Sequence, residues 1–286
     1  MAIHWPTFIT RAITAIVFVI VMAAGLFWSR WSFFLLFSVI HFGCWIEYQR
    51  IISKINSTES QINPFHNYAL MIAGWCLLLF FTNGQLQLKG IDLSKVGLWL
   101  GILSVVILPI ALSFSKLKLS LNFIGYSLFG LVYISLSLGL MIYLRSHWSE
   151  AEYSLSMVIP AVIIFSLWIN DTMAYIVGSL VGKTPLSPIS PKKTWEGTIG
   201  GLALSILIMC TLAHITGRLS LVHTAMLTFI AAVSGTFGDM FQSKLKRMAG
   251  VKDSGKFMPG HGGFLDRFDS LLFAAIACTV YAFLVL

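Results

Sequence analysis

The sequence predicts an all-α, polytopic integral membrane protein with about nine transmembrane helices. Of the 286 residues, 57% are apolar and only 10% are charged, and the mean hydropathy is +0.86. Roughly a quarter of the residues of a soluble domain are charged, and so large an apolar excess does not fit inside one core. The composition therefore excludes a water-soluble globule.

Nine apolar runs are candidates for spanning a bilayer, which takes about 20 residues as a helix. The runs lie at 11–28, 31–47, 68–82, 96–114, 121–144, 155–181, 198–216, 222–240 and 269–286. The third run is short, and the first two share only a hinge at Ser29 to Trp31, where a helical hairpin or a re-entrant element is possible. In the fourth run, Gly97 and Gly101 have the spacing of closely packed helices.

No internal repeat and no long biased linker divides the chain. We therefore expect a single membrane domain over 1–286, with N-terminal helices in 1–150 and catalytic helices and cytoplasmic loops in 151–286. With a cytoplasmic N-terminus, 14 of the 19 Lys and Arg residues fall on the inner side, as the positive-inside rule favours. Nine of these 14 belong to the two polar segments described next, so their position also reflects chemistry.

The net charge of +8 suits anionic lipid headgroups or phosphates better than nucleic acid in so apolar a chain. The four cysteines lie singly in apolar runs, without CxxC or Cys/His spacing. That pattern predicts neither a zinc site nor a disulfide framework.

Polar residues concentrate in two segments, 170–197 and 238–270. In the second segment an apolar helix runs into Asp239, and helical spacing places Ser243, Lys246 and Arg247 on the same face. The loop that follows contains glycines, which let backbone approach a ligand closely. The polar residues of this loop and of the start of the last run are Lys252, Asp253, His261, Asp266, Arg267 and Asp269.

These residues fit phosphate chemistry on Mg²⁺, which is usually held by one or two carboxylates together with substrate phosphates. Asp239 and Asp266 are the predicted Mg²⁺ ligands, because they lie at the inner ends of successive spans and a hairpin brings such ends together. His261 lies between glycines with no Cys or second His nearby, which favours a backbone-organising or substrate-contacting role over zinc. The alternative for the segment is a solvated basic loop that binds lipid headgroups.

The first polar segment places Asn170 and Asp171 inside an apolar run. Placing an ionised Asp near the bilayer centre costs about 2.5 to 3.5 kcal/mol of insertion free energy. We therefore predict that Asp171 is functional and faces a polar cavity. The alternative is a buried contact between helices. Further along, the paired Lys192 and Lys193 suit the phosphates of a nucleotide or, alternatively, anchor the chain at the membrane surface. Gly182-Lys183-Thr184 is not a P-loop, because the glycine spacing is short and no strand precedes it.

The stretch from Ser243 to Asp269, SKLKRMAGVKDSGKFMPGHGGFLDRFD, resembles the signature of the phosphatidate cytidylyltransferases, or CDP-diacylglycerol synthases. The upstream stretches NDTMAYIVGSLVGK and SPKKTWEG are also similar to that family, and all three lie within the last 120 residues. Met258 stands where the signature is expected to have Ile, Leu or Phe, which is a conservative difference.

The resemblance implies transfer of CMP from CTP to phosphatidic acid, giving CDP-diacylglycerol and pyrophosphate, with Mg²⁺ as the cofactor. It also implies that Asp239 and Asp266 belong to the metal centre. Together with the reading of the residues, it gives these predicted catalytic residues: Asp171, Lys193, Asp239, Ser243, Lys246, Arg247, Asp253, His261, Asp266 and Arg267. The residues predicted to bind the nucleotide phosphates are Lys192, Lys193, Lys246 and Arg247.

Two other functions stay open at this point. A CTP-dependent polyprenol or lipid kinase transfers the γ-phosphoryl group to a lipid alcohol and releases CDP without pyrophosphate. An ion-coupled transporter built around Asp171 calls for paired symmetric halves, which the sequence does not show. We expect a bacterial inner membrane location with the active site facing the cytoplasm. The expected partners are CTP, phosphatidic acid, membrane lipid and a second copy in a homodimer, and no nucleic acid.

Overall fold

The computed structural model describes residues 5–55, 64–114, 121–148, 153–257 and 262–286. These residues group into two compact units. The first unit comprises Met1–Ser146 and Met248–Arg267, and the second comprises His147–Arg247 and Phe268–Leu286. A grouping by proximity does not test whether the chain is one membrane domain, so the single domain stays a prediction.

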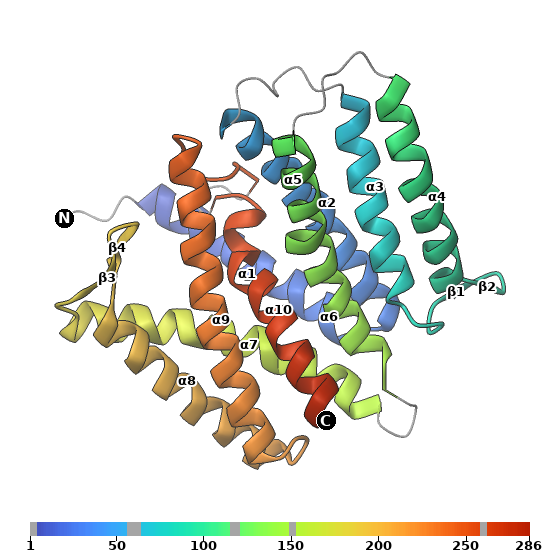
Figure 1. Cartoon of the computed structure of the whole chain (residues 1–286). Coiled ribbons are helices and arrows are strands. Elements are labelled where there is room, and N and C mark those ends of the chain that lie inside the picture. The colour runs from blue at the N-terminus through green and yellow to red at the C-terminus, as the bar shows by residue number, and fades with distance from the viewer. Residues whose placement is uncertain (1–4, 56–63, 115–120, 149–152, 258–261) are drawn as a thin grey trace. The chain divides into compact units, whose positions relative to one another are not determined.

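The regular secondary structure of the described residues is helical, apart from two short hairpins (Figure 1). Each of the nine predicted apolar runs falls on a helix or on a continuous series of helical segments. Six helical stretches are long and apolar enough to cross a membrane, and three shorter apolar helices, Ile13–Phe27, His66–Phe80 and Leu93–Ile107, accompany them. The predicted all-α, multi-pass membrane fold is confirmed.

The first unit begins with α1 (Trp5–Phe27) and α2 (Arg30–Ile55). The hinge predicted near Ser29 separates them, and it is closed by a reciprocal cap. The backbone N–H of Ser32 donates to Ser29 Oγ at 3.0 Å, and the backbone N–H of Ser29 donates to Ser32 Oγ at 2.9 Å. These bonds satisfy amides at the start of α2 that have no partner within the helix.

The next elements are α3 (Pro64–Phe80), the strands β1 (Gln87–Leu88) and β2 (Ile91–Asp92), and α4 (Leu93–Phe114). β1 and β2 form an antiparallel hairpin, and α3 and α4 pack side by side (Figure 1). Gly97 of α4 lies against the α3 backbone at Cys76 and Phe80, where any side chain would collide. The small-residue packing predicted at Gly97 is therefore confirmed.

The last helical stretch before residue 147 consists of three consecutive segments: α5 (Leu121–Gly130), the π-helix η2 (Leu131–Leu136) and α6 (Ser137–Ser146). The π-turn carries Ser135, whose hydroxyl accepts a hydrogen bond from Trp45 Nε1 at 2.8 Å and lies 3.0 Å from His41 Nε2. All three side chains are buried. The wider π-turn thus places the Ser135 hydroxyl within hydrogen-bonding distance of both Trp45 and His41. The polar atoms involved therefore have partners although they are buried.

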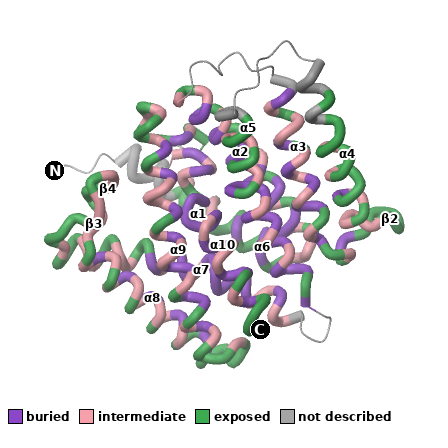
Figure 2. The backbone as a smooth tube through the Cα atoms, viewed as in Figure 1, coloured by how far each residue is buried: buried purple, intermediate pink, exposed green. Residues whose placement is uncertain are grey.

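α2 has 12 buried residues among its 26, and buried stretches of its tube are purple (Figure 2). The apolar run predicted over about 31–47 lies within this helix, which continues to Ile55. The apolar run stops at Glu47, whereas the helix does not, since that carboxylate is buried and receives hydrogen bonds.

The second unit contains α7 (Tyr153–Val181), the hairpin of β3 (Pro185–Ser187) and β4 (Ser190–Thr194), α8 (Trp195–Thr216), α9 (Leu221–Met248) and most of α10 (Leu265–Val285). α7 and α8 lie side by side, with the hairpin at their shared end (Figure 1). Gly197 and Gly201, on one face of α8, press against Ala174 of α7, so small residues let the two backbones approach closely.

α9 continues past the predicted apolar run, which ended at residue 240, and stops at Met248. This extension places Ser243, Lys246 and Arg247 on the last turns of the helix, as their spacing predicted. Lys246 and Arg247 also suit the negative end of the helix dipole.

Candidate active site

In the second unit, α9 and α10 approach each other through glycines of α9. A side chain at Gly238 would collide with the backbone carbonyl of Asp269, and one at Gly235 would collide with Leu167 of α7. Because Asp239 follows Gly238 directly, this close packing delivers its carboxylate to the side of Asp269.

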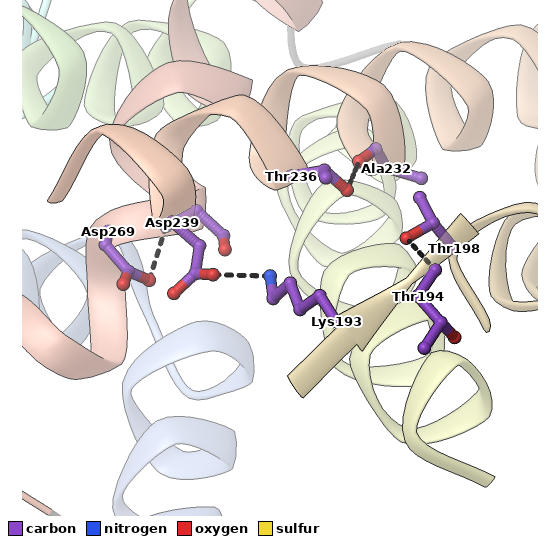
Figure 3. Close-up of polar contacts among 8 residues, drawn as sticks. Lys193, Thr194, Thr198, Ala232, Thr236, Asp239 and Asp269 are labelled. Atoms are coloured by element: carbon purple, nitrogen blue, oxygen red, sulfur yellow. Dashed lines mark hydrogen bonds and ion pairs between the residues drawn. The ribbon is translucent and has the colours of Figure 1, made fainter. Parts of the chain in front are cut away.

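Three side chains meet at this point (Figure 3). Lys193 Nζ of β4 forms an ion pair with Asp239 Oδ2. The side chains of Lys193 and Asp239 are 32% and 25% exposed, whereas Asp269 is buried and only 7% exposed. The carboxyl groups of Asp239 and Asp269 are close enough to hydrogen-bond, and Asp171 of α7 is close enough to interact electrostatically with Asp269. We call Lys193, Asp171, Asp239 and Asp269 the acidic cluster.

The acidic cluster combines three carboxyl groups with the ammonium of Lys193. Two carboxyls within hydrogen-bonding distance repel each other unless a proton or a cation lies between them. Asp239 and Asp269 therefore fit a divalent cation. Within the described residues, no three His, Cys, Asp or Glu side chains are arranged as a metal site on their own. Mg²⁺ does not need three, because substrate phosphates and waters complete its shell.

Lys193 is positioned by local structure at the start of α8. Thr194 caps that helix, because its Oγ1 accepts the Gly197 N–H at 3.1 Å. Alternation along β4 directs Lys192 and Lys193 to opposite faces, and Lys192 is exposed.

The connection before β3 is held by Glu196, which accepts the backbone N–H groups of Lys183 and Thr184, each at 3.2 Å. Those amides are thus occupied by a protein carboxylate, and helix α7 rather than a strand precedes them. Both observations agree with the exclusion of a P-loop at Lys183 and Thr184.

In the first unit, a different set of acids binds the loop before α10. The described residues of this loop are 249–257 and 262–264, and we call it the signature loop. Asp266 Oδ2 accepts the backbone N–H of Ser254 at 2.8 Å and that of Gly263 at 3.1 Å. Glu47 of α2 accepts Ser254 Oγ at 2.6 Å and the backbone N–H groups of Phe264 and Leu265 at 3.0 and 2.9 Å. We call Glu47, Ser254 and Asp266 the loop anchor.

The structure brings together part of the predicted site. The predicted residues of the second unit are Asp171, Lys192, Lys193, Asp239, Ser243, Lys246 and Arg247, and those of the first unit are Asp253, Asp266 and Arg267. Lys193, Asp239 and Asp171 converge on the acidic cluster. The pairing of Asp239 with Asp266 on one Mg²⁺ stays a prediction, and His261 lies outside the described residues.

Sequence reasoning left two residues of these sites without a role, Asp269 and Glu47. Asp269 had a visible signal, because it follows Asp266 by three residues and so lies one helical turn further along α10. Glu47 had only a weak signal, a single acid at the end of an apolar run far from the polar segments. An intramembrane acid of this kind is a reason to look for function.

The fold and the acidic cluster define a class: a multi-pass, all-α membrane protein with a polar, lysine-paired carboxylate site. The sequence profile described as the Cytidylyltransferase family matches residues 9–285. The chain belongs to the cytidylyltransferase family.

Individual relatives agree with the family. A phosphatidate cytidylyltransferase of Bacillus subtilis (strain 168) is 33% identical over 202 residues, which cover 70% of this chain and 71% of the relative. One from Staphylococcus haemolyticus is 48% identical over 109 residues, which cover 37% of this chain and 42% of the relative. A chloroplastic phosphatidate cytidylyltransferase 4 of Arabidopsis thaliana is 42% identical over 125 residues, which cover 43% of this chain and 32% of the relative. The matched segments thus span less than half of the length of the last two relatives.

Proposed function

We propose that the protein transfers CMP from CTP to phosphatidic acid and thereby forms CDP-diacylglycerol and pyrophosphate. The observation that carries this proposal is the acidic cluster, in which Lys193 pairs with Asp239 beside Asp269. Family membership and the printed names of the relatives support the same reaction.

The reaction forms one bond and breaks another at the α-phosphorus of CTP. A phosphate oxygen of phosphatidic acid attacks in line, the bond from the α-phosphorus to the bridging oxygen breaks, and pyrophosphate leaves with that oxygen. The attacking group is already an anion, so no strong general base is needed. The chain's main task is to hold the two phosphates in line and to offset their charge.

Asp239 and Asp269 would hold Mg²⁺, and Asp266 is a further proposed ligand. Bound there, Mg²⁺ would supply positive charge to offset the charge that develops on the phosphates. Lys193 offers three donors, of which one is used by Asp239, so the ammonium also has donors for a phosphate oxygen. We propose that Lys246 and Arg247, at the end of α9, bind the pyrophosphate portion of the nucleotide and that Lys192 of β4 makes a weaker contact.

The membrane supplies the lipid substrate, and CTP comes from the cytoplasm. We therefore propose that the acidic cluster faces the cytoplasm from a bacterial inner membrane and that the protein is a homodimer. The excess of Lys and Arg on the predicted inner side supports the orientation. Cysteines introduced next to Lys193 should react with an impermeant thiol reagent only from the cytoplasmic side, and the mass of the detergent-solubilised particle tests the dimer.

The direct test uses the purified protein in detergent with CTP, phosphatidic acid and Mg²⁺. We expect equimolar pyrophosphate and a lipid that carries CMP. Release of CDP with a phosphorylated lipid would replace the proposal with a lipid kinase. Absence of any CTP turnover, together with ion-dependent solute uptake into vesicles, would replace it with a transporter.

A further inference from the structure

Glu47 is a buried acid on α2, 5% exposed, and it lies more than 200 residues before the signature loop to which it bonds. Its two oxygens receive three donors from that loop. Oε1 accepts the Phe264 N–H, and Oε2 accepts both the Leu265 N–H and Ser254 Oγ. Leu265 is the first residue of α10, so Glu47 caps α10 from a different helix. A carboxylate in this place also complements the positive end of the helix dipole.

The same face of α2 seats the loop through an aromatic side chain. One turn before Glu47, Gly43 lies directly against the ring of Phe264, and any side chain at Gly43 would occupy the position of that ring. Phe264 in turn packs on Phe257, with ring centroids 4.1 Å apart. α2 therefore fixes the closing residues of the loop by both hydrogen bonds and packing.

Two glycines of the signature loop make room for the Glu47 carboxylate. A side chain at Gly255 or at Gly263 would collide with its oxygens. The sequence suggested that loop glycines admit a ligand, and for these two positions the structure shows a side chain of the protein in that role.

Ser254 joins Glu47 to Asp266. Its hydroxyl donates to Glu47, and its backbone N–H donates to Asp266 Oδ2, which also accepts the Gly263 N–H. Displacement of Glu47 therefore releases the two backbone segments that orient Asp266.

We propose that Glu47 is a positioning residue for nucleotidyl transfer: it holds the signature loop and the start of α10 so that Asp266 has the orientation required for catalysis. This inference rests on the proposed function. Glu47 does not contact substrate in it and acts only through the loop anchor.

The test compares Glu47→Gln with Asp92→Asn. Both substitutions replace an acid by its amide next to a helix start, since Asp92 precedes α4 and accepts the Ser94 N–H at 2.8 Å, away from the loop anchor. In Glu47→Gln one oxygen becomes an NH₂ group, which cannot accept a backbone N–H. We expect hydrogen exchange of the Phe264 and Leu265 amides to quicken at least about tenfold in Glu47→Gln and to stay unchanged in Asp92→Asn.

Turnover is measured on the same samples. We expect kcat to fall about 10 to 100-fold in Glu47→Gln with the KM for CTP changed less than about threefold, because misplaced groups lower the rate more than they weaken binding. Glu47→Asp, which keeps both oxygens, should recover part of kcat. Ser254→Ala removes one hydrogen-bond donor to Glu47 and keeps the backbone, so it should lower kcat by a smaller factor. This variant replaces Glu47→Gln in the test if Glu47→Gln does not fold.

Each outcome decides the inference. Unchanged exchange at Phe264 and Leu265 in both Glu47→Gln and Ser254→Ala overturns the anchoring, whatever the reaction. Quickened exchange with unchanged kcat overturns the role in catalysis. If the unsubstituted protein produces no CMP-bearing lipid, the proposed function and the catalytic role fail together, and the exchange measurement still decides whether Glu47 anchors the loop.

Discussion

The acids of the two units have different partners. In the loop anchor, Glu47 and Asp266 accept backbone N–H groups and a serine hydroxyl, all of which are fixed donors of the protein. In the acidic cluster, the carboxyl groups of Asp239 and Asp269 lie within hydrogen-bonding distance of each other. Asp239 forms an ion pair with Lys193, and Asp269 accepts the backbone N–H of its neighbour Ser270 at 2.7 Å. Fixed donors of the chain thus surround the Glu47 carboxylate, whereas Asp239 and Asp269 lie against each other, where the proposed Mg²⁺ would offset their repulsion.

This difference separates the positioning role proposed for Glu47 from the chemical role proposed for Asp239 and Asp269. An acid surrounded by backbone donors holds the chain in place, and its removal leaves those donors unpaired. An acid that faces another acid is costly in the folded protein and persists where a bound cation offsets the repulsion. Substitutions in the two sets should therefore differ in which property they change.

The largest effect is expected from Asp239→Asn and Asp269→Asn. Each removes a charge that is proposed to hold Mg²⁺, so turnover should fall at least about 100-fold while the thermal midpoint in detergent stays the same or rises. The assay is release of pyrophosphate with CTP and phosphatidic acid, with Asp92→Asn as the control. Retention of more than about a tenth of the activity, which is a barrier change below about 1.4 kcal/mol, would remove these two residues from the metal site.

Lys193→Met should give the next largest effect. The loss of the ammonium removes the ion pair of Asp239 beside Asp269 and removes donors for a phosphate, so we expect a fall of about 10 to 100-fold in kcat/KM for CTP. Lys192→Met is the matched comparison, since that side chain is exposed on the other face of β4. Equal losses in both variants would show that only the local positive charge matters.

Gly263→Ala tests the loop anchor through packing. Its methyl group would collide with the Glu47 carboxylate, and we expect a stability loss of about 1 to 3 kcal/mol with reduced turnover. Gly125→Ala is the contrasting glycine, because it lies in α5 with no atom near the added methyl group, and it should stabilise the protein by about 0.5 to 1 kcal/mol. Thermal unfolding in detergent measures both. If Gly263→Ala leaves the stability and the turnover unchanged, the Glu47 side chain has space to move away from the added methyl group.

Ser135→Ala should have the smallest effect. It deletes the buried hydroxyl that pairs with Trp45 and His41, and hydrogen bonds between membrane helices are worth about 0.6 kcal/mol on average, with a maximum near 1.7 kcal/mol. We expect a stability loss within this range and unchanged kcat per folded molecule. A fall in kcat without a fall in stability would extend the functional site into the first unit's core.

The sequence alone predicted the all-α membrane fold, because the composition and the lengths of the apolar runs depend only on the bilayer as solvent. It also predicted Lys193, Asp239 and Asp171 as site residues, since charged groups near apolar runs are costly and stand out. The ends of α2 and α9 were less predictable, because an apolar run stops at the first charge, whereas a helix continues while its polar side chains find partners.

Only the tertiary structure decided which acids meet. Asp239 reaches Asp269 because Gly238 lets α9 press against α10, and Glu47 reaches Leu265 across more than 200 residues because Gly43 and Gly263 leave room for the contact. Such pairings depend on the space between elements that are distant in the chain. A sequence specifies which residues carry charge, and only the packing of the helices determines whether a charge is met by a backbone amide, by a lysine or by another acid.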